Sequence, residues 1–188
     1  MATSSFRIER RETVAHFILC DSASRNALKR DFWMQFPKIV RDLDRDGEIR
    51  ALILRGDGNH FSSGIDVSLL SAFVAEPGDR ELGRSRANLR LMLLKMHEVF
   101  DALAKARFPS IAAVQGACLG GALDLATACD IRLATSDAYF SIQEIQMGWS
   151  PTLALFNVFR GSFRNRWLES WRILAVVSTP TELSSWDS

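Results

Sequence analysis

The fold is decided by residues 111–124, which read IAAVQGACLGGALD. The run opens with four apolar residues, 111–114, as is typical of a buried strand. A glycine-rich turn follows, after which residues 122–129 favour a helix and 131–134 a second strand. The order is therefore strand, glycine turn, helix, strand.

Segments on both sides of this run have similar periodicity. Apolar clusters predict two strands joined by a hairpin turn, a strand before the loop 55–58, and a strand before residue 144. Helical spacing predicts two amphipathic helices, one with Asp31 as N-cap and Pro37 inside it, the other ending before Pro109. Strands and helices alternate without a repeat of fixed period, so the sequence predicts an α/β domain. The strands are expected at 6–10, 14–19, 51–54 and 139–142, and the helices at 31–43 and 86–103.

Composition restricts the class of protein. A chain of 188 residues, 47% hydrophobic and 24% charged, can bury the core of one domain. A net charge of +1 argues against a nucleic-acid partner. No run reaches the roughly 20 apolar residues of a membrane span, and the N-terminus lacks a signal-peptide pattern, so a cytoplasmic location is expected. Cys20, Cys118 and Cys129 are expected to be free thiols.

Two glycine turns and two carboxylates are the candidates for chemistry. Gly120-Gly121 precedes a helix whose first amides could bind an oxyanion, although such glycines also serve close packing of helix on strand. The loop 61–66 could likewise be only a turn. Asp124 lies one helical turn beyond Gly121, where it could simply oppose the helix dipole. Glu144 follows a short strand and could be any surface carboxylate.

Taken together, five stretches resemble the enoyl-CoA hydratase/isomerase (crotonase) family over residues 6–148. They stand in the order and spacing of that family. The resemblance implies a crotonase-like spiral of ββα turns. The stretches are SRNAL at 24–28, FSSGID at 61–66, IAAVQG at 111–116, GGALD at 120–124 and CDIR at 129–132.

The resemblance also implies an active site. In the family, two amides, here those of Ile65 and Gly121, form an oxyanion hole for the thioester oxygen of an acyl-CoA. Each such donor is worth roughly 3 to 4 kcal/mol at the transition state. The two acid/base positions of the family carry Asp124 and Glu144 here. The substrate-binding positions implied are Arg25, Ala27, Leu28, Ser63, Gly64, Asp66 and Gly120.

The choice between reactions depends on two side chains. Asp at 124 and Ile at 65 resemble the dienoyl-CoA isomerase branch of fatty-acid β-oxidation, whereas hydratases usually have Glu at both acid/base positions. The alternatives are an enoyl-CoA hydratase and, in another class, an inactive or non-catalytic acyl-CoA-binding remnant. No cofactor is expected, since CoA is part of the substrate. No metal site is expected, because the histidines lack ligand spacing. They are His16, His60 and His97.

The resemblance stops after Gly148. Residues 149–188 contain four of the five tryptophans, and Thr152 stands where the isomerase branch has a third carboxylate. When the codons of the tail are read in a frame shifted by one base, they can encode a sequence of the family type. In that frame the codons of Trp186 and Asp187 always contain a glycine codon. We therefore interpret 1–148 as a crotonase-like core and 149–188 as an aberrant, out-of-frame tail. The C-terminal helical region is accordingly missing or scrambled.

Loss of that region has predicted consequences. In the family, the C-terminal helices close over CoA and build the trimer interface. We expect a homotrimer or a dimer of trimers if the C-terminus is intact, and weak or no activity for the chain as written. Sequencing of the gene across the codon of Gly148 tests the frameshift: an intact frame for Trp149 onward in several isolates would contradict it.

Overall fold

The first two strands of the protein form the predicted hairpin. The structure is a computed structural model that describes residues 5–69, 82–142 and 175–177. β1 (Phe6–Arg11) pairs antiparallel with β2 (Val14–Leu19), so that the first residue of one strand lies opposite the last of the other. Glu12 makes the turn with a φ of 51°. The hairpin forms one edge of the main sheet.

The main sheet continues from β2 through parallel strands only. Its order is β1-β2-β3-β4-β6-β8, and every pair after the hairpin is parallel. Strands of a parallel sheet are buried on both faces, which explains the nearly continuous apolar runs in the sequence. The added strands are β3 (Ala51–Gly56), β4 (Ser110–Val114), β6 (Ile131–Thr135) and β8 (Ala175–Val177).

A second, smaller sheet reveals the spiral. β5 (Ala117–Leu119) pairs parallel with β7 (Tyr139–Ser141). Two isolated parallel bridges extend this layer, one between Leu28 and Ile65 and one between Ser62 and Cys118. β2, β3, β4 and β6 are thus each followed by a short extended segment, and these segments lie against one another in chain order. The α/β class and the predicted spiral of ββα turns are confirmed.

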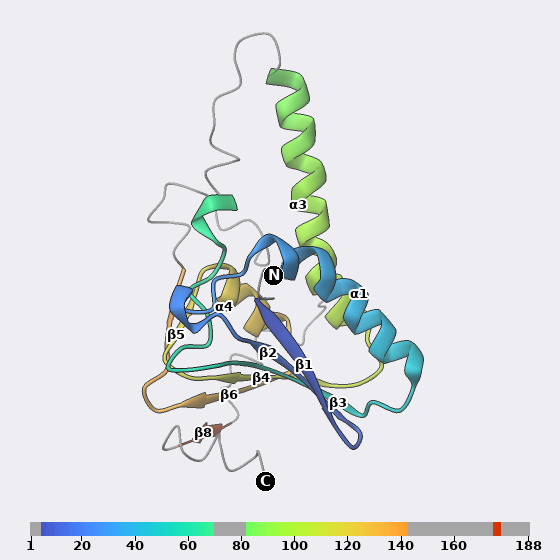
Figure 1. Ribbon diagram of the computed structural model, residues 1–188, viewed down its shortest axis with the longest axis vertical. Helices are drawn as coiled ribbons and strands as arrows, with labels where there is room; N and C mark the ends of the chain where they lie inside the picture. The colour runs from blue at the N-terminus through green and yellow to red at the C-terminus, as the bar shows by residue number, and fades with distance from the viewer. Residues whose placement is uncertain (1–4, 70–81, 143–174, 178–188) are drawn as a thin grey trace, which may run out of the picture.

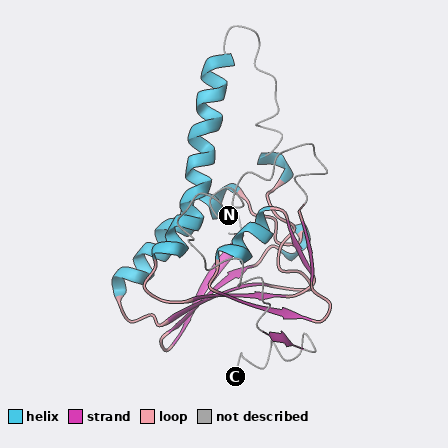
Figure 2. Cartoon of the chain, turned by 180° about the vertical axis from the view of Figure 1, so that it is seen from behind, coloured by secondary structure: helices cyan, strands magenta, loops and turns pink. Residues whose placement is uncertain are grey.

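Within the parts of the chain that the structure describes, α-helices precede three of the parallel strands, as such connections require. α1 (Arg30–Asp46) leads into β3, α3 (Leu82–Lys105) leads into β4, and α4 (Gly121–Ala128) leads into β6. Figures 1 and 2 show all three helices on the same side of the six-stranded sheet. α3 is about 36 Å long at 1.5 Å per residue, and its first half extends beyond the body of the domain.

Aromatic side chains of β2 and α1 fill the space between sheet and helices. Phe32 and Phe36, one helical turn apart, are fully buried. The ring of Phe17 lies 4.8 Å from that of Phe36 in an edge-to-face arrangement and 4.8 Å from that of Phe6 in a stacked one. Such pairs contribute about 0.5 to 1.5 kcal/mol beyond the area they bury. The apolar spacing of the predicted helix thus corresponds to its observed core face.

The start of α1 differs from the sequence prediction. Its N-cap is Lys29, in an extended conformation, and not Asp31. The carboxylate of Asp31 instead accepts hydrogen bonds from the Ser5 hydroxyl, at 2.8 Å, and from the Ser5 amide, at 3.1 Å. Asp31 remains in the first turn, where it still opposes the helix dipole. A partner 26 residues away in the chain is not visible in the local sequence.

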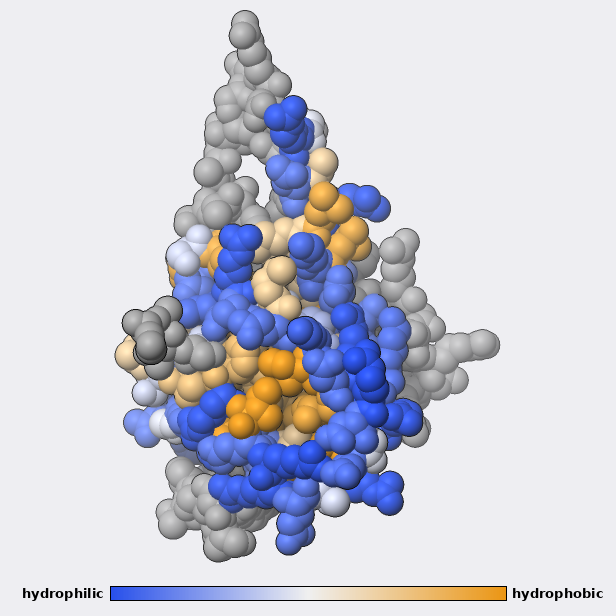
Figure 3. Space-filling model, turned by 45° about the vertical axis from the view of Figure 1, so that its right-hand side comes forward, coloured by the Kyte–Doolittle hydropathy of each residue, from blue (hydrophilic) through white to orange (hydrophobic). Residues whose placement is uncertain are grey.

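The surface is polar with local apolar areas. Figure 3 shows apolar side chains at the centre of one face, ringed by polar ones, and again near the projecting helix. On α3, Leu91 is 58% exposed and Leu94 is 47% exposed. None of the described helices combines the length and the apolar character that crossing a bilayer requires.

Candidate active site

Loops at the carboxyl ends of β2, β3 and β4 lie side by side and form the candidate site. The first two are joined by backbone hydrogen bonds. The Ser63 amide donates to the Arg25 carbonyl at 2.9 Å, and the Leu28 amide donates to the Gly64 carbonyl at 2.8 Å. The Asp66 amide returns a bond of 3.2 Å to the Leu28 carbonyl. The predicted SRNAL and FSSGID stretches are therefore joined into one hydrogen-bonded unit.

The second loop is joined to the third in the same manner. The Phe61 amide donates to the Gln115 carbonyl at 2.7 Å, and the Ser62 amide donates to the Ala117 carbonyl at 3.0 Å. The Leu119 amide returns a bond of 3.2 Å to the Ser62 carbonyl. Three stretches separated by up to about a hundred residues of chain thus meet at one edge of the sheet, where ligands of parallel sheets bind.

Glycines allow the second and third loops to touch through their backbones. A Cβ atom on Gly64 would lie 2.5 Å from the Leu119 carbonyl oxygen and 3.4 Å from the Gly121 amide nitrogen. A Cβ atom on Gly121 would lie 2.8 Å from Cγ1 of Ile65 and 3.7 Å from its amide nitrogen. The amides predicted to form the oxyanion hole are therefore close neighbours in space.

The direction of the Ile65 amide is fixed by its own peptide group. Gly64 has a φ of 90°, which favours glycine, and its carbonyl accepts the bond from Leu28. In a trans peptide the N–H points opposite to the C=O, and no described peptide is cis. The Ile65 N–H is therefore directed away from the first loop.

The Gly121 amide is oriented by the helix that it begins. The Gly120 carbonyl accepts bonds from the Leu123 amide at 2.8 Å and the Asp124 amide at 3.1 Å, so the Gly121 N–H points out of the N-terminus of α4. No hydrogen bond among the described residues uses the amide of Gly121 or that of Ile65. Two adjacent donors are thus available to an acceptor atom.

Asp124 lies next to this pair of donors. It is in the first turn of α4, three residues after Gly121, and only 9% of its surface is exposed. A mostly buried carboxylate one helical turn from such a donor is the kind of group that exchanges a proton with a carbon next to a bound carbonyl. Glu144, the second predicted acid/base residue, lies outside the described residues.

The other predicted substrate-binding residues differ in accessibility. Arg25 is exposed, with a φ of 53°, and Ala27 and Ser63 are half-buried. Leu28 is fully buried, and both its amide and its carbonyl are hydrogen bonded to the second loop. The half-buried Asp66 accepts a bond from the Ser68 amide at 2.8 Å. Direct contact with a substrate stays a prediction for all of them, and Leu28 also has a clear role in joining the loops.

Comparison with known sequences identifies the family. The model of the enoyl-CoA hydratase/isomerase family matches residues 9–161, more than three quarters of the chain. The chain belongs to the enoyl-CoA hydratase/isomerase family. The match includes all five stretches that carried the resemblance and ends beyond Gly148, the predicted limit of the core.

Similar members of this family include dienoyl-CoA isomerases. The peroxisomal Delta(3,5)-Delta(2,4)-dienoyl-CoA isomerase of Arabidopsis thaliana is 41% identical over 136 residues, which are 72% of the chain and 49% of the relative. The mitochondrial enzyme of that name from Mus musculus is 36% identical over 135 residues, 72% of the chain and 41% of the relative. The chain thus spans about half the length, or less, of these relatives.

Solved structures of the family have the same fold. An enoyl-CoA hydratase/carnithine racemase from Magnetospirillum magneticum aligns with a TM-score of 0.69 and 25% identity, over 79% of the chain and 53% of that protein. A Thermobifida fusca protein assigned as an enoyl-CoA hydratase, solved with acetoacetyl-CoA, aligns with a TM-score of 0.69 and 28% identity, over 82% of the chain and 61% of that protein.

The expected cytoplasmic location is wrong. The similar isomerases are named as peroxisomal or mitochondrial proteins. The expectation rested on the lack of an apolar signal peptide, which bears only on secretion. Mitochondrial leaders are amphipathic and a peroxisomal address can be three residues long, so neither produces an apolar run.

Two buried polar residues in the loops were missed by the sequence prediction. Asn26 is 1% exposed and Ser62 is fully buried, and both hydrogen bond across the first two loops. One signal was available for Asn26, since asparagine tolerates the left-handed conformation, here with a φ of 55°, that a tight polar turn requires. Nothing in the local sequence distinguishes Ser62 from Ser63.

Histidines and acids do not gather into a metal site within the described parts of the chain. His16 is buried in β2, and Nδ1 of His60 accepts a bond of 3.2 Å from the Ala117 amide. His60 thus takes part in joining the second and third loops. Absence of a metal from the chemistry stays a prediction.

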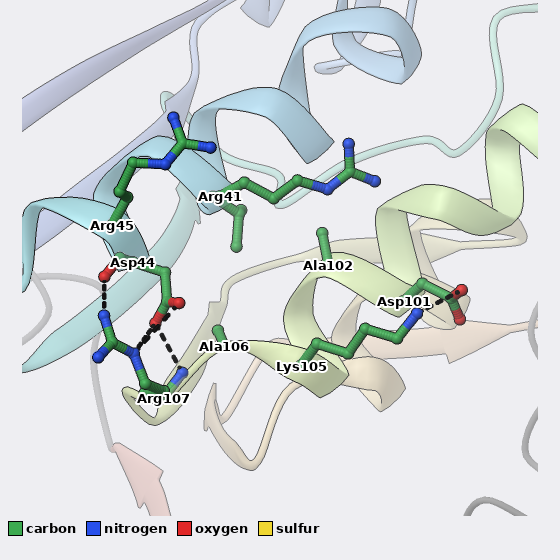
Figure 4. A pocket seen from close by; sticks show the side chains of 9 residues that line it. Arg41, Asp44, Arg45, Asp101, Ala102, Lys105, Ala106 and Arg107 are labelled. Carbon is green, nitrogen blue, oxygen red and sulfur yellow. Dashed lines mark hydrogen bonds and ion pairs between the residues drawn. The ribbon is translucent and has the colours of Figure 1, made fainter.

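A separate pocket of about 500 Å³ lies between the ends of α1 and α3 (Figure 4). Its charged side chains are paired: Lys105 with Asp101 at 3.2 Å and Arg107 with Asp44 at 3.1 Å. The Arg107 amide and side chain hold the pKa of Asp44 below its ordinary value. Because both helices lead into the amino ends of strands, this pocket is at the opposite edge of the sheet from the candidate site.

Proposed function

We propose that the chain is an acyl-CoA double-bond isomerase of the dienoyl-CoA type, acting in fatty-acid β-oxidation. The observation that carries this proposal is the meeting of two available amides, those of Ile65 and Gly121, at the start of the helix whose first turn contains the mostly buried Asp124. The similarity to isomerases of that name, at 36% and 41% identity, supports the same reaction.

The proposed mechanism uses the amides to stabilise charge. The thioester oxygen of the substrate accepts both N–H groups, and loss of a proton from C2 places negative charge on that oxygen. Preorganised donors then lower the barrier by roughly 3 to 4 kcal/mol each. One carboxylate removes the proton at C2 and the other donates one at C6, so that the two double bonds move by one position and no atom is gained or lost. Asp124 is one carboxylate, and we assign Glu144 as the other.

Hydration of an enoyl-CoA is the second candidate. It is favoured by the similarity in fold and sequence to the Thermobifida fusca protein, at 28% identity. Isomerisation to a 2,4-diene brings the double bonds into conjugation with the thioester and increases near-ultraviolet absorbance. Hydration removes a double bond from conjugation and decreases it. The sign of the absorbance change therefore separates the two reactions.

The test is a comparison of two aspartate variants with the full chain. Incubated with a 3,5-dienoyl-CoA, a chain with the reading frame restored after Gly148 should produce the rise in absorbance, whereas the chain as written should produce little or none. In the restored chain, Asp124→Asn should lower the rate by about 100-fold or more. Asp137→Asn is the matched control, since Asp137 is exposed in the loop after β6. Equal rates for the two variants would contradict the role of Asp124. Binding of the CoA ester without turnover by the restored chain would favour the non-catalytic alternative.

Partners and the tail remain proposals as well. We propose an acyl-CoA thioester as the sole ligand, without a further cofactor, and a homotrimer or dimer of trimers when the C-terminal part is intact. Light scattering on the purified protein measures the assembly, and a monomer with an intact C-terminus would contradict it. We keep the proposal that residues 149–188 are out of frame, and of this tail the structure describes only β8.

A further inference from the structure

A buried serine joins the first and second loops at Gly64, one residue before Ile65. Ser62 is fully buried. Its hydroxyl donates to the Asn26 carbonyl at 2.7 Å and accepts from the Gly64 amide at 3.1 Å. The Ser62 hydroxyl therefore uses both its donor and its acceptor. It connects the Gly64 N–H in the second loop to the Asn26 carbonyl in the first.

The anchor for this serine is itself held firmly. Asn26 is 1% exposed, and its side-chain amide donates to the Asp57 carbonyl at 2.9 Å and to the His60 carbonyl at 2.8 Å. The Asn26 amide donates to the Asp21 carbonyl at 2.8 Å. The Asn26 carbonyl accepts the hydrogen bond from the Ser62 hydroxyl. This carbonyl is held in place because both the side chain and the backbone N–H of Asn26 are hydrogen bonded.

The residue that Ser62 holds is oriented by two hydrogen bonds, of which Ser62 provides one. Gly64 has no side chain and a φ of 90°. Two hydrogen bonds therefore define the orientation of its peptide groups: its N–H donates to the Ser62 hydroxyl, and its carbonyl accepts from the Leu28 amide. Without the hydroxyl, the Gly64 amide and the Asn26 carbonyl would lose their partner inside the protein, and the backbone would have to move to recover one.

We propose that Ser62 is a positioning residue, which acts through Gly64 to aim the Ile65 amide at the thioester oxygen. The proposal rests on the proposed function, because it requires that oxygen to bind between Ile65 and Gly121. Ser62 itself would not touch the substrate, since it is fully buried.

Infrared spectroscopy of a bound ligand tests the proposal directly. The probe is acetoacetyl-CoA labelled with carbon-13 at the thioester carbonyl, bound to the full chain. Hydrogen bonds from the two amides should lower the stretching frequency of that carbonyl. In Ser62→Ala this downward shift should fall to roughly half or less, and the affinity should fall about tenfold, because one of two donors is misdirected.

A second buried serine provides a matched control. Ser110 is 1% exposed, and its hydroxyl donates to the Asp130 carboxylate at 2.9 Å and accepts from the Asp130 amide at 3.1 Å. It opens β4, at the edge of the sheet opposite to the loops. Ser110→Ala likewise removes both hydrogen bonds of a buried hydroxyl, here with the exposed Asp130, yet the carbonyl shift should equal that of the wild type.

Each outcome decides a different point. A full shift in Ser62→Ala overturns the positioning role and leaves the proposed function standing, whereas a reduced shift in both serine variants overturns it as mere loosening of the fold. Should Ser62→Ala fail to fold by circular dichroism, Ser62→Cys, a weaker donor and acceptor, decides: an intermediate shift supports the proposal and a full shift overturns it. A wild-type chain that neither binds the ester nor shifts its band overturns the proposed function and this inference with it.

Discussion

Replacing Gly121 by alanine should separate the stability of the fold from the function of the site. The new methyl group would lie 2.8 Å from Cγ1 of Ile65, closer than side-chain contacts normally come, and 3.7 Å from the Ile65 amide nitrogen. It would therefore push Ile65 aside and occupy space beside both proposed donors.

The effect on stability should be small because two terms oppose each other. Moving the Ile65 side chain from its preferred rotamer costs about 0.5 to 1.5 kcal/mol. Alanine in a helix, here α4, gains up to about 1 kcal/mol over glycine. The free energy of unfolding should then change by less than about 1 kcal/mol. Catalysis should fall by about 100-fold, the low end of what loss of one oxyanion donor costs.

Two other glycines provide the comparison. Gly64→Ala should lower the free energy of unfolding by at least about 2 kcal/mol, since its φ is 90° and its Cβ would lie 2.5 Å from the Leu119 carbonyl oxygen. Gly83→Ala, on α3 with nothing within 4 Å of the new atom, should raise the free energy of unfolding by up to about 1 kcal/mol and leave the activity unchanged. Urea unfolding and the dienoyl-CoA absorbance assay measure the two effects. A Gly121→Ala variant with full activity, or one destabilised as much as Gly64→Ala, would refute the reasoning.

Three further predictions concern the rest of the fold. Arg132→Met should lower the free energy of unfolding in urea by about 1 to 3 kcal/mol, because the buried guanidinium donates to the Cys129 carbonyl at 2.6 Å at the end of α4; an unchanged midpoint would contradict this. Native protein treated with iodoacetamide should be modified first at the half-buried Cys20. Burial raises the pKa of the Cys118 thiol and raises that of Cys129 to about 12, so both react slowly. Early labelling of either buried thiol, detected by mass spectrometry, would exclude this. Hydrogen bonds from the side chains of Lys29 and Ser24 lower the pKa of Asp21 in the folded protein. The stabilising contribution of Asp21 is therefore complete above the ordinary pKa of 3.8 and is lost as the pH falls through the lower folded pKa. Asp21→Asn should remove that part of the acid sensitivity in unfolding scans, and identical pH profiles of variant and wild type would argue against it.

The main sheet could be predicted from sequence because its strands carry their own signal. Residues 111–114 are apolar, and residues 131–134 are apolar except for Arg132. Both strands were placed within one residue of their observed ends, as was β2. Periodicity located α1 and α3 but set both too short, because apolar spacing marks only the buried face and α3 projects beyond the core. Local pattern thus predicted which elements exist and was weakest at their ends.

Contacts between distant segments were less accessible to prediction. The bridge between Leu28 and Ile65 involves single residues, too few to produce alternation in the sequence. The meeting of Gly64 with Leu119 depends on backbone conformations that only the resemblance to a family implied. The polar pair Asn26 and Ser62 was missed because burial of a hydroxyl or an amide is decided by a partner elsewhere in the chain.

The stacking of one ββα turn on the next makes the molecule nearly one-dimensional. β3 pairs with β2, β4 with β3 and β6 with β4, so each turn is supported by the turn before it. Stability of such an array is a sum of terms between neighbours, as in solenoid proteins. Evolution could therefore extend or exchange the later turns while the junction of the first three, which holds Ile65 and Gly121, keeps its geometry.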